Sequence, residues 1–452
     1  MNLYLIGHDY RYAAEQMLLT LFPDERPEYP DGRPTGDRAE LRLMSGTKVT
    51  TVTCVLVYHG QTANGRTSVP NGELTDPAEK DRRLQGAIKR AFYRAAMGIG
   101  LPHRPWGMLT GVRPGKLMTP LLAQGLNDAQ AARQFERQYD VSPARADLVV
   151  RTAHATLRAM ESLGEKDVCL YVGIPFCPTR CAYCSFVSQS VEKSMALVPE
   201  FLQALAREIA ATAEAVRRAG LRVVSLYIGG GTPTTLSARQ LDALCTQLAA
   251  AFDLSALREF TVEAGRPDTI TADKLHVLRL VRETGGFAVN MDLIAGLPGD
   301  TPDGFRATLE QVLALAPENV TVHTLSRKRG SNLMAQDAPI PDGAAVGEML
   351  DFAGTVLPRT GYAPYYLYRQ KFMSGGFENV GWTRPGQENL YNICIMEELC
   401  SILAMGGGAS TKLVRPNGGR LERHIDPKYP TEYIANIDRI CAAKAELEAF
   451  FQ

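Results

Sequence analysis

The sequence predicts an α/β protein in which strands alternate with helices through the middle of the chain. Two observations lead to this prediction. From about residue 165, apolar runs of strand length alternate with longer stretches of helical spacing, a pattern typical of βα units and a parallel sheet. The chain also has 452 residues, too many for one compact domain. We therefore expect an α+β domain over residues 1–160, a strand–helix domain over 165–335 and a C-terminal domain over 340–452.

The N-terminal part contains both strand and helix patterns. Its apolar spacing predicts a strand, a helix, a hairpin and a second helix, at 3–6, 13–22, 41–58 and 81–97. The run 104–116 then carries Trp106, three cations and several turn residues. This run is either a rigid connector around a packed tryptophan or an anion site.

The middle of the chain contains five apolar runs that predict strands. They lie at 168–174, 223–228, 260–263, 288–294 and 319–325. Helical spacing predicts helices at 198–219, 237–252, 271–284 and 302–315, and near 391–403 in the C-terminal part.

Composition excludes several classes of function. Lysine plus arginine and aspartate plus glutamate each number 49, so no nucleic-acid or membrane-surface partner is indicated. There is no apolar stretch of membrane-spanning length and no leader pattern at the N-terminus, and we expect a cytoplasmic protein. Six of the nine cysteines are isolated in apolar or helical contexts, which indicates reduced, buried thiols.

The other three cysteines follow an apolar strand pattern with the spacing C-x3-C-x2-C, at Cys177, Cys181 and Cys184. A [4Fe–4S] cluster normally takes four protein thiolates, so three leave one iron open to a ligand. A zinc site without an obvious fourth ligand and buried structural cysteines are the competing interpretations. Closed zinc sites favour paired C-x2-C units, which this chain lacks. The motif therefore favours an iron–sulfur enzyme.

Further candidate residues lie at the ends of the next strands. Gly229, Gly230 and Gly231 follow an apolar strand, where the lack of a Cβ lets the backbone approach a ligand closely. Glu263 ends the following strand, and Asp292 interrupts an apolar run, so that each carboxylate needs a partner. An ordinary turn and an exposed strand-end acid are the simpler interpretations.

The cysteine spacing, with an aromatic residue before the last cysteine, resembles the cluster loop of the radical S-adenosylmethionine (SAM) superfamily. The flanking residues, Tyr171-Val-Gly-Ile-Pro-Phe and Ser185-Phe186, are similar to the oxygen-independent coproporphyrinogen III oxidase family, and most to its longer branch with an N-terminal extension. The resemblance implies a [4Fe–4S] cluster, SAM and a partial TIM-like (β/α) barrel. Such barrels have six βα units in this family, whereas this sequence shows five and is one unit short between Glu263 and Asn290.

The resemblance also implies residue roles. The cluster ligands would be Cys177, Cys181 and Cys184. The SAM-binding residues would be Tyr171, Tyr183, Gly230, Gly231, Thr232, Glu263, Asp292 and Ser326.

The function that the family implies is oxidative decarboxylation of coproporphyrinogen III propionates to vinyl groups, with an electron donor such as flavodoxin or ferredoxin. Cationic side chains at the end of the last predicted strand would suit the propionate carboxylates, or else form a solvated strand end. They are His323, Arg327, Lys328 and Arg329. Phe186 stands where characterised oxidases have a fourth cysteine, and relatives with phenylalanine there include haem-binding chaperones. Two more functions stay open at this point: a radical SAM tetrapyrrole methyltransferase, and a degenerate paralogue with impaired SAM binding.

Overall fold

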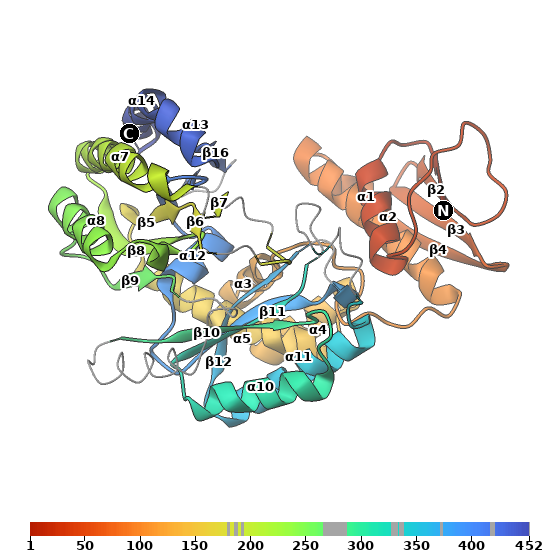
Figure 1. The fold of residues 1–452 in the computed structure, drawn as a ribbon. Helices are drawn as coiled ribbons and strands as arrows, with labels where there is room; N and C mark the ends of the chain where they lie inside the picture. Colours follow the sequence, from red (N-terminus) through yellow and green to blue (C-terminus); the bar gives the residue numbers. More distant parts are fainter. Residues whose placement is uncertain are drawn as a thin grey trace. The chain divides into compact units, whose positions relative to one another are not determined.

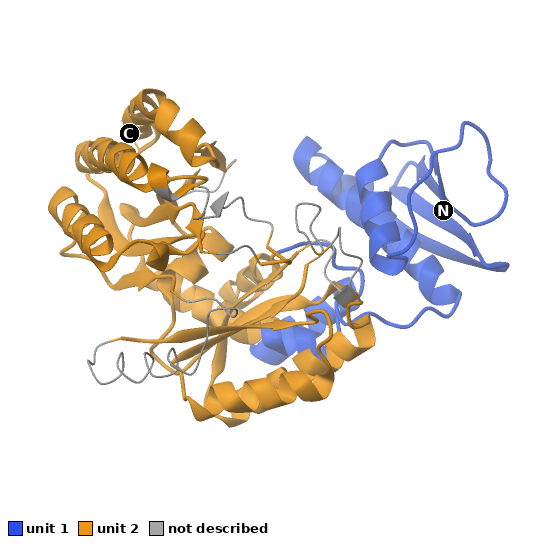
Figure 2. Ribbon diagram, viewed as in Figure 1, with its two compact units in different colours: residues 1–112, 126–148 blue, residues 113–125, 149–452 orange. Residues whose placement is uncertain are grey.

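The computed structural model describes residues 1–178, 181–184, 189–190, 194–264, 287–326, 333, 339–370, 374–415 and 421–451. These residues form two compact units (Figure 2). The first contains residues 1–112 and 126–148, and the second contains 113–125 and 149–452. The chain is thus a mixed α/β protein, as predicted. The three predicted domain boundaries stay a prediction, although strands from both sides of residue 340 share the sheets of the second unit.

The first unit is built on a four-stranded sheet (Figure 1). Its strands, in sheet order, are β1 (Asn2–Ile6), β2 (Arg38–Ser45), β3 (Val49–Tyr58) and β4 (Gln61–Pro70), and its helices are α1 (Arg11–Leu21), α2 (Pro77–Gly98) and α4 (Asp128–Tyr139). The predicted hairpin is confirmed, because β2 and β3 pair antiparallel. Strand β4 was not predicted, since it has few apolar residues. Trp106 is 2% exposed, which confirms the packed tryptophan.

The second unit contains a six-stranded sheet in the order β16-β15-β14-β5-β8-β9. Its strands are β5 (Asp167–Ile174), β8 (Arg222–Gly230), β9 (Glu259–Val262), β14 (Ser401–Gly406), β15 (Ser410–Leu413) and β16 (Glu422–Ile425). Strands β14, β5, β8 and β9 are parallel, as the βα pattern predicts. The prediction of one helix over 391–403 is wrong in its second half. Helix α12 (Leu390–Glu397) ends where Glu398 takes a left-handed conformation at φ 57°, and the residues that follow form strand β14.

Residues along β5 alternate between the two faces of this sheet. Leu170 and Val172 face the larger core, which holds helices α7 (Val198–Arg218), α8 (Ala238–Ala251), α13 (Pro430–Ala435), α14 (Ile437–Ala445) and α15 (Leu447–Phe451). Cys169 and Tyr171 face the opposite side, where they pack with Tyr391 of α12. Figure 1 shows α7 and α8 together on one side of β5 and β8.

A second sheet in this unit has the order β10-β11-β13-β12. Its strands are β10 (Asn290–Ala295), β11 (Asn319–Thr324), β12 (Ala363–Arg369) and β13 (Glu378–Thr383), and α10 (Pro302–Ala314) and α11 (Gly343–Arg359) accompany them. Strands β10 and β11 are parallel, whereas β13 pairs antiparallel with both β11 and β12. The predicted helix at 271–284, and with it the place where the sequence is one βα unit short, lies outside the described residues, so the shortened barrel stays a prediction.

The remaining elements of the second unit are short or join its parts. They are α3 (Gly115–Ala123), β6 (Phe176–Cys177) and β7 (Gln189–Ser190), while α5 (Pro143–Ser162) has residues in both units. Arg113 and Lys116 both pair with Glu398 within the second unit, which favours a structural connector over an anion site.

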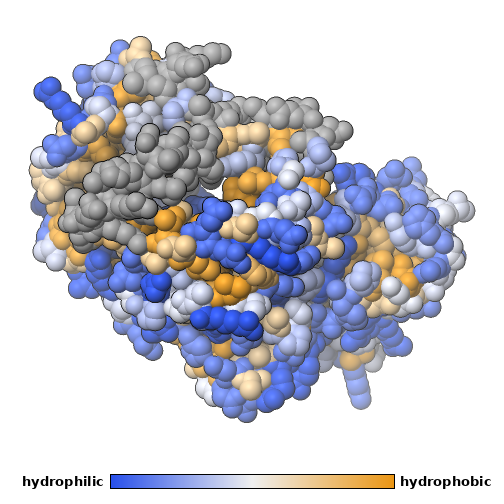
Figure 3. Space-filling model, turned by 60° about the horizontal axis from the view of Figure 1, so that its bottom comes forward, coloured by the Kyte–Doolittle hydropathy of each residue, from blue (hydrophilic) through white to orange (hydrophobic). Residues whose placement is uncertain are grey.

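Hydrophilic and apolar side chains are intermixed on the face drawn in Figure 3. Among the described helices, none has the length and apolar character needed to span a bilayer.

Candidate functional site

The three predicted cluster cysteines follow strand β5, at the carboxyl edge of the six-stranded sheet. Cys177 ends β6 and is 4% exposed. Cys181 and Cys184 are partly exposed and belong to one turn, in which the Cys184 amide donates to the Cys181 carbonyl at 3.1 Å. The loop therefore offers one thiol at the buried end of a strand and two that are partly exposed.

The predicted glycine loop lies directly against the start of the cysteine loop. Parallel pairing of β5 with β8 brings the two strand ends together, and the Gly231 amide donates to the Ile174 carbonyl at 2.7 Å. A Cβ on Gly231 would stand 2.5 Å from the Phe176 carbonyl oxygen and 3.0 Å from Cys177 Sγ, so only glycine fits. Gly230 adopts φ +114°, which also requires glycine. Thr232 Oγ1 lies 3.6 Å from Cys177 Sγ.

Glu263 joins this arrangement from the next strand position. Its amide donates to the Ile228 carbonyl at 2.9 Å. Its carboxylate accepts from the Tyr227 hydroxyl at 2.8 Å and from the Gly230 amide at 3.2 Å. Burial raises the pKa of Glu263 to about 7, and the charge of Asp292 adds to the rise while Tyr227 opposes it. Glu263 therefore changes charge near neutral pH, beside the glycine loop.

Asp292 lies on β10, and 60% of its side chain is accessible. Asn290 donates to its Oδ1 at 2.7 Å, and His323 Nε2 on β11 lies 3.8 Å from its Oδ2. Desolvation acts to raise the pKa of Asp292, but the hydrogen bonds and the charge of His323 outweigh it and leave that pKa lowered. His323 also approaches the Tyr368 hydroxyl at 3.5 Å. Arg327, Lys328 and Arg329 lie outside the described residues.

Tyr171 is part of an aromatic stack that sequence reasoning did not find. Its ring lies 6.0 Å from both Tyr227 and Tyr391, which are 4.4 Å apart. Tyr227 and Tyr391 are 164 positions apart in the chain (391 − 227), and no local spacing signals their contact. Tyr183 sits between Cys181 and Cys184 and is partly exposed, as is Ser326 after β11. The SAM-binding roles of these residues stay predictions.

The structure brings together three cysteines that are isolated from one another in the sequence. Among the described residues, Cys169, Cys394 and Cys400 form a group whose sulfurs all lie within 4.8 Å. The predicted ligands Cys177, Cys181 and Cys184 do not form such a compact group. A wider spacing is what the corners of a four-iron cube require, because each thiolate binds a different iron.

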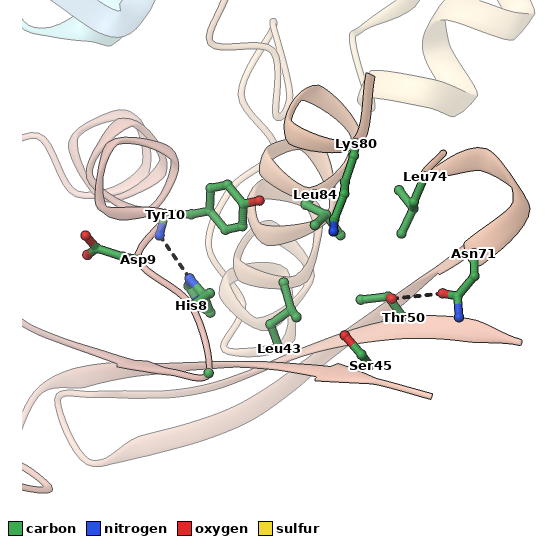
Figure 4. A pocket seen from close by; sticks show the side chains of 11 residues that line it. His8, Asp9, Tyr10, Leu43, Ser45, Thr50, Asn71, Leu74, Lys80 and Leu84 are labelled. Atoms are coloured by element: carbon green, nitrogen blue, oxygen red, sulfur yellow. Dashed lines mark hydrogen bonds between the residues drawn. The ribbon is translucent and has the colours of Figure 1, made fainter. Parts of the chain in front are cut away.

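A separate cavity of about 610 Å³ lies in the first unit (Figure 4). His8, Tyr10 and Lys80 line it, and the Thr50 hydroxyl donates to Asn71 Oδ1 at 2.9 Å on its wall. None of the predicted cluster or SAM residues takes part in it. The chemistry of the candidate site therefore rests on the second unit.

The residues at the sheet edge fit the [4Fe–4S] cluster that the cysteine spacing predicts and the SAM that the family resemblance implies. Three thiols on one loop can occupy three corners of a cube, and glycine backbone beside them leaves space that a Cβ would fill. Among curated proteins, the oxygen-independent coproporphyrinogen-III oxidase-like protein HemZ of Bacillus subtilis is 36% identical over 421 residues. That match covers 83% of this chain and 84% of the relative. The chain belongs to the oxygen-independent coproporphyrinogen III oxidase family. Proteins of this radical SAM family use a [4Fe–4S] cluster and SAM.

The chain also matches other curated proteins at lower identity. The heme chaperone HemW of Haemophilus influenzae is 25% identical over 310 residues, covering 59% of this chain and 75% of the relative. The oxygen-independent coproporphyrinogen III oxidase of Escherichia coli is 29% identical over 247 residues, covering 46% and 53%. A solved E. coli structure, described as a coproporphyrinogen III oxidase (HemN) and radical SAM enzyme, gives a TM-score of 0.46 at 22% identity, covering 64% of this chain and 72% of that one. No protein-family model matches the chain.

Proposed function

We propose that this protein is a radical SAM enzyme that decarboxylates the propionate side chains of coproporphyrinogen III to vinyl groups. The observation that carries the proposal is the hydrogen-bonded contact between the C-x3-C-x2-C loop and the glycine loop that holds Glu263. Membership of the oxidase family supports the reaction class. The relatives named as oxidases support the substrate.

Cys177, Cys181 and Cys184 would hold the cluster, and one iron would remain open to SAM. Bound there, the cluster and SAM would supply the radical chemistry needed at a substrate C–H bond. The chain's own residues bind and orient SAM. The Glu263 carboxylate already accepts two hydrogen bonds and has lone pairs left for the ammonium group of SAM's methionine part.

The polar residues of the second sheet would face the substrate side of the site. Asp292 and His323 lie on adjacent parallel strands. The Asp292 side chain is accessible, and its lowered pKa favours the charged form. A carboxylate there can accept hydrogen bonds from a ribose hydroxyl or from a pyrrole N–H. The stack of Tyr171, Tyr227 and Tyr391 presents aromatic surface between strands β5 and β8 and helix α12, which would keep water out of this side.

Haem binding without radical turnover is the second candidate function. Phe186 occupies the position where characterised oxidases have a fourth cysteine. The chain also matches heme chaperones named HemW from three bacteria over 59 to 63% of its length. A haem-binding function predicts stable haem binding by a protein that leaves coproporphyrinogen III unchanged.

One anaerobic incubation distinguishes the two candidate functions. The reconstituted, reduced protein is mixed with SAM and coproporphyrinogen III, and the tetrapyrroles are analysed by mass. We expect one or two propionates to be converted to vinyl groups, each with the loss of CO₂ and two hydrogens. Unchanged porphyrinogen together with stoichiometric binding of added haem would instead favour the chaperone function. A methylated tetrapyrrole would point to a methyltransferase.

Glu263 gives the proposal a pH dependence. Its pKa of about 7 means that the carboxylate is mostly ionised at pH 8 and mostly protonated at pH 6. If its charge binds the SAM ammonium, the affinity for SAM should fall about tenfold from pH 8 to pH 6, because the ionised fraction falls by that factor. Isothermal titration of the reconstituted protein measures this change.

The matched variant is Glu263→Gln, which keeps the shape of the side chain and one of its two acceptor oxygens but removes the charge. We expect weaker SAM binding with no change between pH 6 and pH 8, while the iron content stays that of the wild type. The same pH profile in Glu263→Gln and wild type would contradict the role given to Glu263.

A further inference from the structure

A buried group of three cysteines lies on the face of the six-stranded sheet that also carries the tyrosine stack. Cys169 comes from β5, Cys394 from α12, and Cys400 immediately precedes β14. Their sulfurs all lie within 4.8 Å of one another, and Cys169 Sγ is 3.6 Å from Cys400 Sγ. The three residues are 0%, 0% and 8% exposed. Three elements from distant parts of the chain therefore present their thiols to one point.

The surroundings of this group are apolar. Val224 and Ile402 are buried beside it, and Leu163, Leu390 and Leu399 pack around it. Among the described residues, the compact group contains cysteines alone, with no histidine or carboxylate within the same distance. The ligand set is thus all sulfur, in a shell that keeps water away.

The distances suit one metal ion and not a cluster. A metal–thiolate bond is about 2.3 Å long, so two thiolates on one ion lie roughly 3.8 to 4 Å apart. The Cys169–Cys400 separation of 3.6 Å is close to this value, and all three separations are within 4.8 Å. A four-iron cube would hold its thiolates farther apart, because each binds a different iron.

We infer that Cys169, Cys394 and Cys400 form a binding site for one thiophilic d¹⁰ metal ion, Cu(I) or Zn²⁺, separate from the C-x3-C-x2-C loop. Thiolates select soft ions of this kind over Mg²⁺, Ca²⁺ or Mn²⁺. The bound ion links β5, α12 and β14, and so fixes the C-terminal strand against the first strand of the parallel sheet. Tyr391 lies one helical turn before Cys394, so the ion also holds the tyrosine stack in place.

The test measures metal binding by the full-length protein in which Cys177, Cys181 and Cys184 are all replaced by alanine. The reduced, metal-free protein is titrated anaerobically with Zn²⁺ and, separately, with Cu(I) delivered from a chromophoric chelator. We expect one equivalent of at least one ion to bind. The denaturation temperature should rise, because a ligand that binds the folded chain alone stabilises it. Binding of either ion supports the proposal and identifies the metal.

Three further variants in the same background locate the ion. Cys394→Ala and Cys400→Ser should each lose the bound equivalent and the rise in denaturation temperature. Cys245→Ala, which changes a partly exposed thiol on α8, should keep both. Circular dichroism checks that each variant is folded. Binding that survives both Cys394→Ala and Cys400→Ser would overturn the proposal, as would the absence of stoichiometric binding.

X-ray absorption provides a measurement that needs no further variant. The protein loaded with one equivalent should show three sulfur neighbours at about 2.3 Å from the metal. A first shell dominated by nitrogen or oxygen would place the ion elsewhere and contradict the site. Neither measurement depends on SAM cleavage, so the inference fails or stands independently of the proposed function.

Discussion

Replacing Cys181 with alanine should remove the iron–sulfur cluster from the protein. The loop supplies three thiols, and two remaining thiolates do not hold the corners of a cube against loss to solvent. We expect iron and acid-labile sulfide to fall from about four per chain to near zero after anaerobic reconstitution, in line with four of each per [4Fe–4S] cluster. The visible absorption of the cluster should disappear with them.

The controls for this prediction are Cys245→Ala and Cys394→Ala. Cys245 lies on α8 and Cys394 belongs to the buried three-cysteine group, so both variants should keep a full cluster. Iron near the wild-type level in Cys181→Ala would show that the cluster is held elsewhere. Cluster loss in Cys394→Ala but not in Cys181→Ala would assign the iron to the buried group.

Replacing Lys444 with methionine should cost the folded state about 3–5 kcal/mol, the range for breaking a buried ion pair by removing one partner. Lys444 on α14 lies 2.8 Å from Glu208 Oε1 and 3.5 Å from Asp426 Oδ2. It also donates to the Ala404 carbonyl of β14 at 2.6 Å. Its side chain is 6% exposed and that of Glu208 is fully buried, so the variant leaves two carboxyl groups without their cation. Urea denaturation followed by circular dichroism measures the loss.

The loss of folding stability in Lys444→Met should increase with pH. Burial already raises the pKa of Asp426 to about 7, although Lys444 acts in the opposite direction. Without Lys444 the pKa of Asp426 rises further above its unfolded value near 4. A carboxyl of raised pKa destabilises the fold once it ionises, so stability falls as pH increases. The deficit of Lys444→Met relative to wild type should therefore be smaller at pH 5 than at pH 8.

Arg439→Met is the matched control for this variant. Arg439 is an exposed cation on the same helix, α14, and its replacement should change stability by less than about 0.5 kcal/mol. An equal loss in the two variants would mean that helix propensity and not the buried charge group sets the stability. A deficit of Lys444→Met that is unchanged between pH 5 and pH 8 would contradict the role of the carboxyl groups.

The strands and helices that carry the candidate site were predictable from sequence, because their signals are local. Strands β5 and β8 are continuous apolar runs, and α8 begins at a capping box formed by Ser237 and Gln240. The C-terminal part was harder. The apolar run after Glu398 has no glycine or proline to mark the end of α12, so it was interpreted as more helix instead of strand β14.

The contacts within the site were less predictable than its elements. Spacing alone identified the C-x3-C-x2-C loop, since its three cysteines lie within eight residues. Glu263 was a candidate, but its partner Tyr227 is 36 positions away and is brought to it by strand pairing. Cys169 and Cys400 are 231 positions apart, and they meet because β14 pairs in parallel with β5. Such pairings are set by tertiary structure and leave no periodic signal in the chain.

Formation of 5′-deoxyadenosine from added SAM would demonstrate radical SAM chemistry in this protein. The reconstituted protein is reduced with dithionite without oxygen, SAM is added, and the nucleoside is quantified against Cys181→Ala treated in the same way. We expect 5′-deoxyadenosine from the wild type in at least the amount of its clusters, and none above background from Cys181→Ala. No cleavage of SAM by wild-type protein that carries an intact, reduced cluster would contradict a radical SAM enzyme.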